Sequence, residues 1–185
     1  MHTRSAIADL LRADLVRWEL LGVVAGLELP DAWIAAGFVR NAVWDKLHGR
    51  DPQPLSGDVD VIWCDPQCLA PARDRAIEAE LRALAPGIDW SVKNQARMHL
   101  RNGDAPYSGA TDAMRHWPET ATAIAARRTI GDCCEIAAPV GIGDLLGLVL
   151  RPTSGFVADR RAIFENRVRE KRWVERWPAL QLASH

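Results

Sequence analysis

Asp58 and Asp60 are the residues of this chain best placed to do chemistry. They stand two residues apart in Asp58-Val59-Asp60-Val61, at the start of an apolar run that ends at Cys64. Because successive side chains of a strand point to opposite faces, the two carboxylates would share one face and the valines the other. Two acids held side by side repel each other, and a divalent cation between them turns that repulsion into a binding site. Mg²⁺ or Mn²⁺ is therefore the expected metal.

Asp89 is a candidate for a third carboxylate at the same place. It lies in Ile88-Asp89-Trp90, an apolar-acid-apolar pattern in the next expected strand. Three carboxylates from two neighbouring strands could hold two Mg²⁺ ions, and Asp89 could ligate the second ion or accept a proton from an attacking hydroxyl. The competing interpretation is that all three are ordinary capping or solvent-facing acids, because Asp-x-Asp on its own is a common pattern.

Upstream, Gly37-Phe38-Val39-Arg40-Asn41 reads as a glycine turn that feeds a helix. The first N–H groups of a helix and its dipole suit phosphate, and Gly37 lets the backbone approach a ligand closely. Arg40 could add charge-assisted hydrogen bonds to phosphate oxygens. The competing interpretation is a plain strand-to-helix turn in which Arg40 pairs with Asp45 or Asp60. A phosphate turn followed by a metal-holding strand would be a layout for nucleotide chemistry.

The elements that must position these residues alternate along the first part of the chain. Apolar periodicity and capping residues predict helices over 3–27, 38–47, 65–84 and 94–100. Strands are expected between them over 33–36, 58–64 and 88–92. This alternation predicts a sheet with helices packed on it, in an α/β (α+β) fold.

The remainder of the chain reads as more helical. Helix pieces are expected at 111–114 and 119–128, a short strand near 135–137, and helices at 141–150 and 158–176. We expect a core over 1–105 and a mainly helical part over 106–185 packed on it as one structural unit.

Composition limits the alternatives. The chain has 185 residues, 48% of them hydrophobic and 25% charged, which is typical of a globular protein of one domain or of one domain with a small appendage. The net charge of −1 offers no general basic field for nucleic acid, so such a partner would need a local patch. No apolar run has the length of a membrane span, and a cytoplasmic protein without a membrane partner is expected. The four cysteines fit no metal-binding spacing and are expected to be reduced thiols.

The two motifs together resemble a known superfamily. Gly37-Phe38-Val39-Arg40-Asn41 followed by Asp58-Val59-Asp60-Val61 is similar to the head of the DNA polymerase beta nucleotidyltransferases, above all to the Gly-Gly-x-Val-Arg-Asp … Asp-x-Asp signature of tRNA nucleotidyltransferases and poly(A) polymerases. The whole stretch 33–180 resembles a family of small bacterial nucleotidyltransferase-like proteins of undefined substrate. The strings that carry this resemblance are 90–99 and 117–123.

The resemblance implies a mixed sheet flanked by helices, with transfer of a nucleoside monophosphate from an NTP to an acceptor hydroxyl. The acceptor is left open, with RNA and a small molecule as candidates. It implies Asp58 and Asp60 as metal ligands, with Asp89 as the best third carboxylate. Nucleotide-binding residues would be Gly37, Phe38, Arg40, Lys93, Asn94 and Arg97. The competing interpretation of the last three is a solvated charged face.

Two departures from the superfamily pattern leave other functions open. Phe38 stands where a second glycine or serine is expected, and Asn41 replaces an aspartate. The base-selecting Glu-Asp-x-x-Arg motif of tRNA nucleotidyltransferases is not found, so the resemblance implies the transfer chemistry but not that acceptor. A non-catalytic NTP- or RNA-binding module, and a toxin or antitoxin component, are the alternatives on the same fold.

Overall fold

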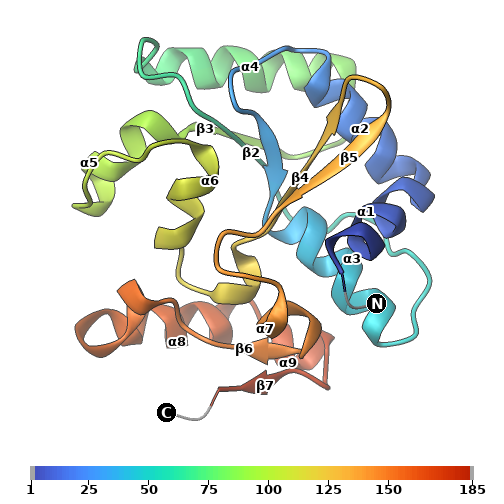
Figure 1. Cartoon of the computed structure of the whole chain (residues 1–185), viewed down its shortest axis with the longest axis vertical. Helices are drawn as coiled ribbons and strands as arrows, with labels where there is room; N and C mark the ends of the chain where they lie inside the picture. The colour runs from blue at the N-terminus through green and yellow to red at the C-terminus, as the bar shows by residue number, and fades with distance from the viewer. Residues whose placement is uncertain (1–2, 184–185) are drawn as a thin grey trace.

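A five-stranded mixed sheet forms the centre of the molecule in a computed structural model that describes residues 3–183 (Figure 1). Its strand order is β3-β2-β1-β4-β5, with β2 and β3 parallel and the other neighbours antiparallel. The strands are β1 (Trp33–Ala35), β2 (Val59–Trp63), β3 (Trp90–Asn94), β4 (Ala125–Thr129) and β5 (Cys133–Ala137). The predicted fold class, a mixed sheet flanked by helices, is confirmed.

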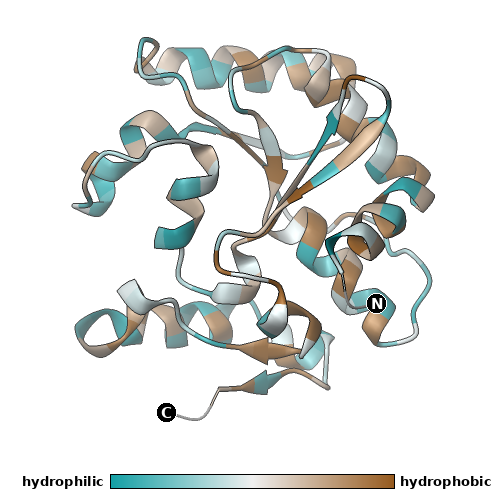
Figure 2. Cartoon of the chain, viewed as in Figure 1, coloured by the Kyte–Doolittle hydropathy of each residue, from teal (hydrophilic) through white to brown (hydrophobic). Residues whose placement is uncertain are grey.

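One face of the sheet carries most of the hydrophobic core. Val59, Val61 and Trp63 point to this face, as strand alternation requires, and belong to one cluster with Ile77 and Leu81. The helices that supply this cluster are α1 (Arg4–Ala13), α2 (Leu15–Ala25), α3 (Gly37–Leu47) and α4 (Pro71–Leu84). Figure 2 shows the amphipathic pattern clearly on α4, where hydrophilic and hydrophobic residues alternate.

The opposite face is covered by the segment that follows β3. Ile62 of β2 and Trp33 of β1 pack there against Ala110 and Met114 in a second, smaller cluster. The helix that contributes to this cluster is α6 (Ala110–Ala113), and α5 (Met98–Asn102), which precedes it, has no buried residue. Asp60 and Ile62 alternate with Val59 and Val61, so Asp60 lies on this second face.

The N-terminal helix predicted over 3–27 is two helices. Asp14 adopts an extended conformation (φ −87°, ψ 99°), and its side chain accepts a hydrogen bond from the backbone N–H of Arg17 at the start of α2. Asp is a strong N-cap residue, and here the capping preference interrupts a continuous apolar rhythm. The predicted helix over 65–84 likewise begins late, at Pro71, because Asp65 forms a turn by accepting from the N–H of Gln67.

The helix predicted over 119–128 is wrong. Residues 120–122 form a single 3₁₀ turn, and Ala125–Thr129 is β4, an inner strand of the sheet. Alanine favours helices in isolation, but a small side chain also fits a strand whose two faces are both covered. The strand expected near 135–137 is confirmed as β5, the partner of β4.

The end of the chain packs against α3, and its buried residues belong to the larger cluster. It contains α7 (Gly143–Leu146), β6 (Val149–Leu150), α8 (Arg161–Glu170), α9 (Trp173–Arg176) and β7 (Gln181–Leu182). The helix expected over 141–150 is thus a short helix and a strand. The helix expected over 158–176 is divided at Arg172, whose φ is +49°. No helix among the described residues is both long enough and apolar enough to cross a membrane.

Candidate active site

The register of the sheet brings the two predicted motifs together. β1 runs antiparallel to β2, and Ala35 at the end of β1 pairs with Asp60 near the start of β2. The chain then turns at Ala36 into α3, which begins at Gly37. The helix start and the two carboxylates therefore meet at one end of these strands, although they are well separated in sequence.

A cavity of about 220 Å³ opens at this meeting point. We call it the carboxylate cavity. It is lined by Ala36, Gly37, Arg40, Asn41, Ser56, Gly57, Asp58, Asp60, Thr122, Arg167, Lys171, Trp173, Arg176 and Trp177. Four of the predicted site residues, namely Gly37, Arg40, Asp58 and Asp60, thus share one cavity.

Asp60 is the less exposed carboxylate of the pair, and its pKa is raised. Its burial and the neighbouring charge of Asp58 raise the pKa of Asp60 to about 6, against the opposing effects of the Ser91 hydroxyl and of the cations Arg40 and Lys171. Asp58 itself is exposed. Burial and the second acid both disfavour the ionised form of Asp60, and a bound cation would offset that cost.

Arg40 is buried and held on several sides. Its Nη1 donates to the Thr122 hydroxyl at 2.9 Å, and its Nη2 donates to the Asn41 side-chain oxygen at 2.9 Å. Its guanidinium carbon lies 5.0 Å from the ring centre of Trp44 and 4.5 Å from that of Trp173. Burial lowers the pKa of Arg40 to about 10, so the group stays cationic at neutral pH. Arg40 is therefore a fixed positive charge in the wall of the cavity.

Ala36, in the turn before α3, has an unusual backbone conformation. This residue has φ +54° and ψ −120°, a region that glycine adopts easily and alanine does not. Phe38, predicted as a nucleotide-binding residue, instead points into the core and is 2% exposed. Because the Phe38 side chain packs into the core, it does not obstruct the turn before α3.

Asp89 lies outside the carboxylate cavity. It precedes β3, and its backbone carbonyl accepts the N–H of Val59 at 2.7 Å. Its side chain lines a different cavity, with Arg17 and Leu55 among the neighbours. The strand predicted over 88–92 is shifted to 90–94, and this shift puts Ser91 rather than Asp89 opposite Asp60. The three-carboxylate cluster expected from the sequence is not formed.

Asn94 and Arg97 are not brought to the cavity. Asn94 is 1% exposed, and its Nδ2 donates to the carbonyls of Asp65 and Cys68 at 2.8 Å each, so it holds a loop in place. Arg97 forms an ion pair with the buried Asp74 of α4. Lys93 pairs with Glu78 at 3.3 Å and lines a cavity next to the carboxylate cavity.

Sequence reasoning missed the contribution of the C-terminal helices. Arg167 of α8, Trp173 and Arg176 of α9, and Lys171 between them all line the carboxylate cavity. The available signal is the density of Arg and Lys over 160–176, a stretch whose sequence pattern predicts only a helix. Nothing local in that stretch indicates that it folds back onto residues near position 40.

The carboxylate pair suits a divalent metal bound jointly with a phosphate ligand. Within residues 3–183, no group of three or more His, Cys, Asp or Glu side chains is placed to hold a metal. Mg²⁺ is commonly bound through one or two carboxylates, with substrate phosphates and water supplying the other oxygens. Asp58 and Asp60 fit that pattern.

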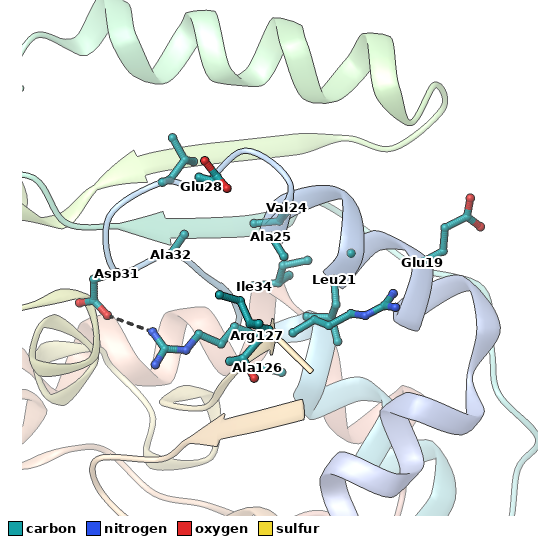
Figure 3. A pocket seen from close by; sticks show the side chains of 15 residues that line it. Glu19, Leu21, Val24, Ala25, Glu28, Asp31, Ala32, Ile34, Ala126 and Arg127 are labelled. Atoms are coloured by element: carbon teal, nitrogen blue, oxygen red, sulfur yellow. Dashed lines mark ion pairs between the residues drawn. The ribbon is translucent and has the colours of Figure 1, made fainter. Parts of the chain in front are cut away.

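A larger cavity lies elsewhere in the fold. It measures about 840 Å³ and opens between α2 and β4, with Leu21, Val24 and Ile34 in its wall (Figure 3). An ion pair of 3.8 Å between Arg127 and Asp31 lies at its edge. It contains none of the predicted site residues, and its mainly apolar wall offers little to a phosphate.

Comparison with known structures defines the class of protein. A solved structure described as revealing a CCA-adding enzyme head domain matches with a TM-score of 0.87 and 32% identity, over 99% of this chain and 97% of that chain. The fold is that of a nucleotidyltransferase head. Residues 22–182 match a family model described as Nucleotidyltransferase, and the chain belongs to that family.

More distant structures share the fold alone. Complexes of CCA-adding enzyme with CTP and with ATP match with TM-scores of 0.56 and 0.51 at 18% and 19% identity. The match covers 96% of this chain in both cases, and 43% and 42% of those enzymes. This chain therefore spans less than half of their length. Comparison with curated proteins finds no match.

Proposed function

We propose that this protein is a metal-dependent nucleotidyltransferase that moves a nucleoside monophosphate from an NTP to an acceptor hydroxyl. The observation that carries the proposal is the meeting of Asp58, Asp60, Arg40 and the helix start at Gly37 in one cavity. Family membership and the nucleotide complexes of proteins with this fold support it.

The residues that line the carboxylate cavity would have different roles. The free N–H groups at the start of α3 and the cations Arg40, Lys171 and Arg176 would hold the triphosphate. Asp58 and Asp60 would hold Mg²⁺ or Mn²⁺. When bound, such a metal neutralises charge on the phosphates and acidifies a nearby hydroxyl.

The reaction balances without any further reagent. The acceptor oxygen forms a bond to the α-phosphorus, the bond between that phosphorus and the bridging oxygen breaks, and pyrophosphate leaves. The hydroxyl proton passes to water. The protein forms no covalent bond in this reaction. Its role would be to orient the phosphates and to stabilise the negative charge that develops on them.

The direct test is transfer of label from each [α-³²P]NTP, with Mg²⁺, to a total extract of cellular RNA and small molecules. Wild type is expected to produce a labelled, acceptor-dependent product with one or more NTPs. Asp58→Asn is expected to abolish it, whereas Asp89→Asn should retain it, because Asp89 lies in another cavity. Full transfer activity in Asp58→Asn would contradict the proposal.

One observation favours a second candidate, a non-catalytic NTP-binding module. Asp89 does not join Asp58 and Asp60, so the third acid that would accept a proton is missing. Calorimetry separates the two functions. NTP binding that is unchanged when divalent metal is removed, together with no transfer to any fraction of the extract, would favour the module.

A further inference from the structure

A second cavity, of about 550 Å³, adjoins the carboxylate cavity. We call it the adjoining cavity. Ala36, Asp60, Thr122 and Arg167 line both cavities. Its lining includes residues of β2, α5 and α8, and Figure 1 shows α5 and α8 at the left of the molecule. Its volume is in the range of small-molecule sites, so it can hold a ligand beside one in the carboxylate cavity.

The charges of the adjoining cavity are strongly unbalanced. Its lining includes the cations Lys93, Arg101, Arg160 and Arg167, and Asp60 is its one carboxylate among the described residues. Glu78 compensates Lys93, and Glu119 compensates Arg167. Neither Arg101 nor Arg160 forms an ion pair with any residue of 3–183. Two guanidinium groups are therefore available to an anionic ligand.

The rest of the wall is apolar and partly aromatic. Met98, Trp117, Phe156 and Ile163 line the cavity, and Ile163 is 47% exposed. The guanidinium of Arg160 lies 4.3 Å from the ring centre of Phe156, which fixes the direction of its positive charge. A ligand that binds both the apolar residues and the two arginines would have a carbon skeleton and an anionic group.

We propose that the adjoining cavity is the acceptor site, and that the acceptor is a small hydroxy compound that carries a phosphate group of its own. This inference rests on the proposed nucleotidyl transfer. The acceptor phosphate would lie toward Arg101 and Arg160, and its hydroxyl would lie toward Asp60, where the two cavities meet. Its oxygen would then reach the α-phosphorus of the NTP, with pyrophosphate leaving and the proton passing to water.

Two observations favour a small molecule over an RNA end. The adjoining cavity gathers four cations around about 550 Å³, whereas the chain as a whole has a net charge of −1. Binding of RNA draws on a row of phosphate contacts along an extended basic surface. The same cationic lining disfavours an acceptor that carries several amino groups, because like charges would meet without compensation.

Tryptophan indole signals in ¹H–¹⁵N NMR spectra of the full chain can report on the two cavities separately. Trp117 lines the adjoining cavity, whereas Trp173 and Trp177 line the carboxylate cavity. The signals would be assigned with Trp→Phe variants. The protein, with Mg²⁺ and a non-hydrolysable NTP analogue, would be titrated with glycerol 3-phosphate, ribose 5-phosphate and glucose 6-phosphate, and with their dephosphorylated counterparts.

At least one phosphate compound is expected to move the Trp117 signal to saturation, whereas its dephosphorylated counterpart does not. Arg101→Gln and Arg160→Gln should each weaken that binding by about tenfold. Arg75→Gln, at an exposed position on α4, should leave it unchanged. Both cavity arginines are at least partly exposed, so their replacement should not prevent folding.

The outcomes separate this inference from the proposed function. If the analogue moves Trp173 and no phosphate compound moves Trp117, the acceptor inference is wrong and the proposed function stands. If only a six-nucleotide RNA with a free 3′ hydroxyl moves Trp117, a small acceptor is excluded. If the analogue itself moves neither Trp173 nor Trp177, the proposed function fails and the acceptor site fails with it.

Discussion

Arg40 and Trp173 stack on each other across the candidate site, with the guanidinium carbon 4.5 Å from the ring centre. Arg40 belongs to the first turn of α3, whereas Trp173 begins α9 near the other end of the chain. Trp44 lies on the same guanidinium at 5.0 Å, and its ring meets that of Trp173 edge to face at 6.0 Å. The C-terminal helices therefore form a wall of the site.

The first prediction concerns Trp173. Trp173→Ala should lower the free energy of unfolding by about 3 kcal/mol, because a buried indole is removed. It should also weaken NTP binding by about tenfold, because Arg40 loses one of the rings that fix it. Trp173→Phe should keep most of both properties. Calorimetry with NTP and chemical denaturation measure the two effects.

Val174→Ala is the matched control for Trp173. Val174 follows it in α9 and is 41% exposed, so its replacement should change neither stability nor NTP affinity measurably. NTP affinity equal to that of wild type in Trp173→Ala, measured where the variant is folded, would show that the C-terminal wall is not part of the nucleotide site.

The second prediction concerns Glu119. It is completely buried, and its Oε1 accepts a 2.8 Å hydrogen bond from Nε of Arg167. Its charge also acts on the buried Arg40. Glu119→Ala would leave both guanidinium groups without their shared counter-charge and should cost about 2–3 kcal/mol of folding free energy. Chemical denaturation measures the loss.

Glu135→Ala provides the comparison for Glu119. Glu135 forms an ion pair of similar length with Arg127, at 2.6 Å, but its side chain is 47% exposed. Exposed pairs contribute little, so this variant should lose less than about 1 kcal/mol. Equal losses in Glu119→Ala and Glu135→Ala would contradict the electrostatic role given to Glu119.

Local patterns were enough to expect the two motifs at one place, and their roles in binding remain a prediction. Strand alternation and the glycine start of α3 sufficed to place Gly37, Asp58 and Asp60, because these signals depend on neighbouring residues. Asp89 was expected beside Asp60, but its position depends on where β3 begins. The strand begins at Trp90, two residues later than predicted, so Asp89 lies just outside the sheet. The position of Trp173 beside Arg40 could not be predicted from local patterns, because it depends on a tertiary contact.

The helix predicted over 119–128 failed for a related reason. Its alanines have high helix propensity, but β4 is an inner strand whose neighbours on both sides supply the hydrogen bonds. Tertiary context decided the conformation there. The bounds of α3 were predicted within one residue, whereas α4 ends at the predicted residue but begins six residues later than predicted.

The third prediction concerns the strained turn at Ala36. Glycine adopts positive φ without penalty, so Ala36→Gly should raise the free energy of unfolding by about 0.5–1 kcal/mol. Ala35→Gly is the control, because Ala35 lies in β1 and glycine there should destabilise by a similar amount. Thermal unfolding of the two variants measures the opposite signs. Loss of stability in both would mean that Ala36 is not strained.

The fourth prediction follows from the pKa of Asp60, which is raised from 3.8 to about 6. An unfolded chain would release this proton near pH 4, so between about pH 4 and pH 6 the folded state holds it more tightly. The stability of metal-free protein should therefore fall through this group as the pH rises across that window. Asp60→Asn should be more stable than wild type above pH 6, and the difference should shrink below pH 4.

Chemical denaturation in buffer with a chelator, at a series of pH values, measures this difference. Asp58→Asn should show a smaller gain, because it removes the repulsion by Asp58 and leaves the burial of Asp60 in place. Wild type more stable than Asp60→Asn at pH 8 without metal would mean that the fold does not disfavour the ionised form of Asp60.

Binding of Mn²⁺ followed by electron paramagnetic resonance, with and without an NTP, tests the proposed metal site most directly. Wild type should bind Mn²⁺ weakly alone and at least tenfold more tightly when an NTP supplies phosphate oxygens. Asp60→Asn should lose this gain, and Asp89→Asn should keep it. Tight, NTP-dependent Mn²⁺ binding in Asp60→Asn would contradict the assignment of Asp58 and Asp60 as the metal ligands.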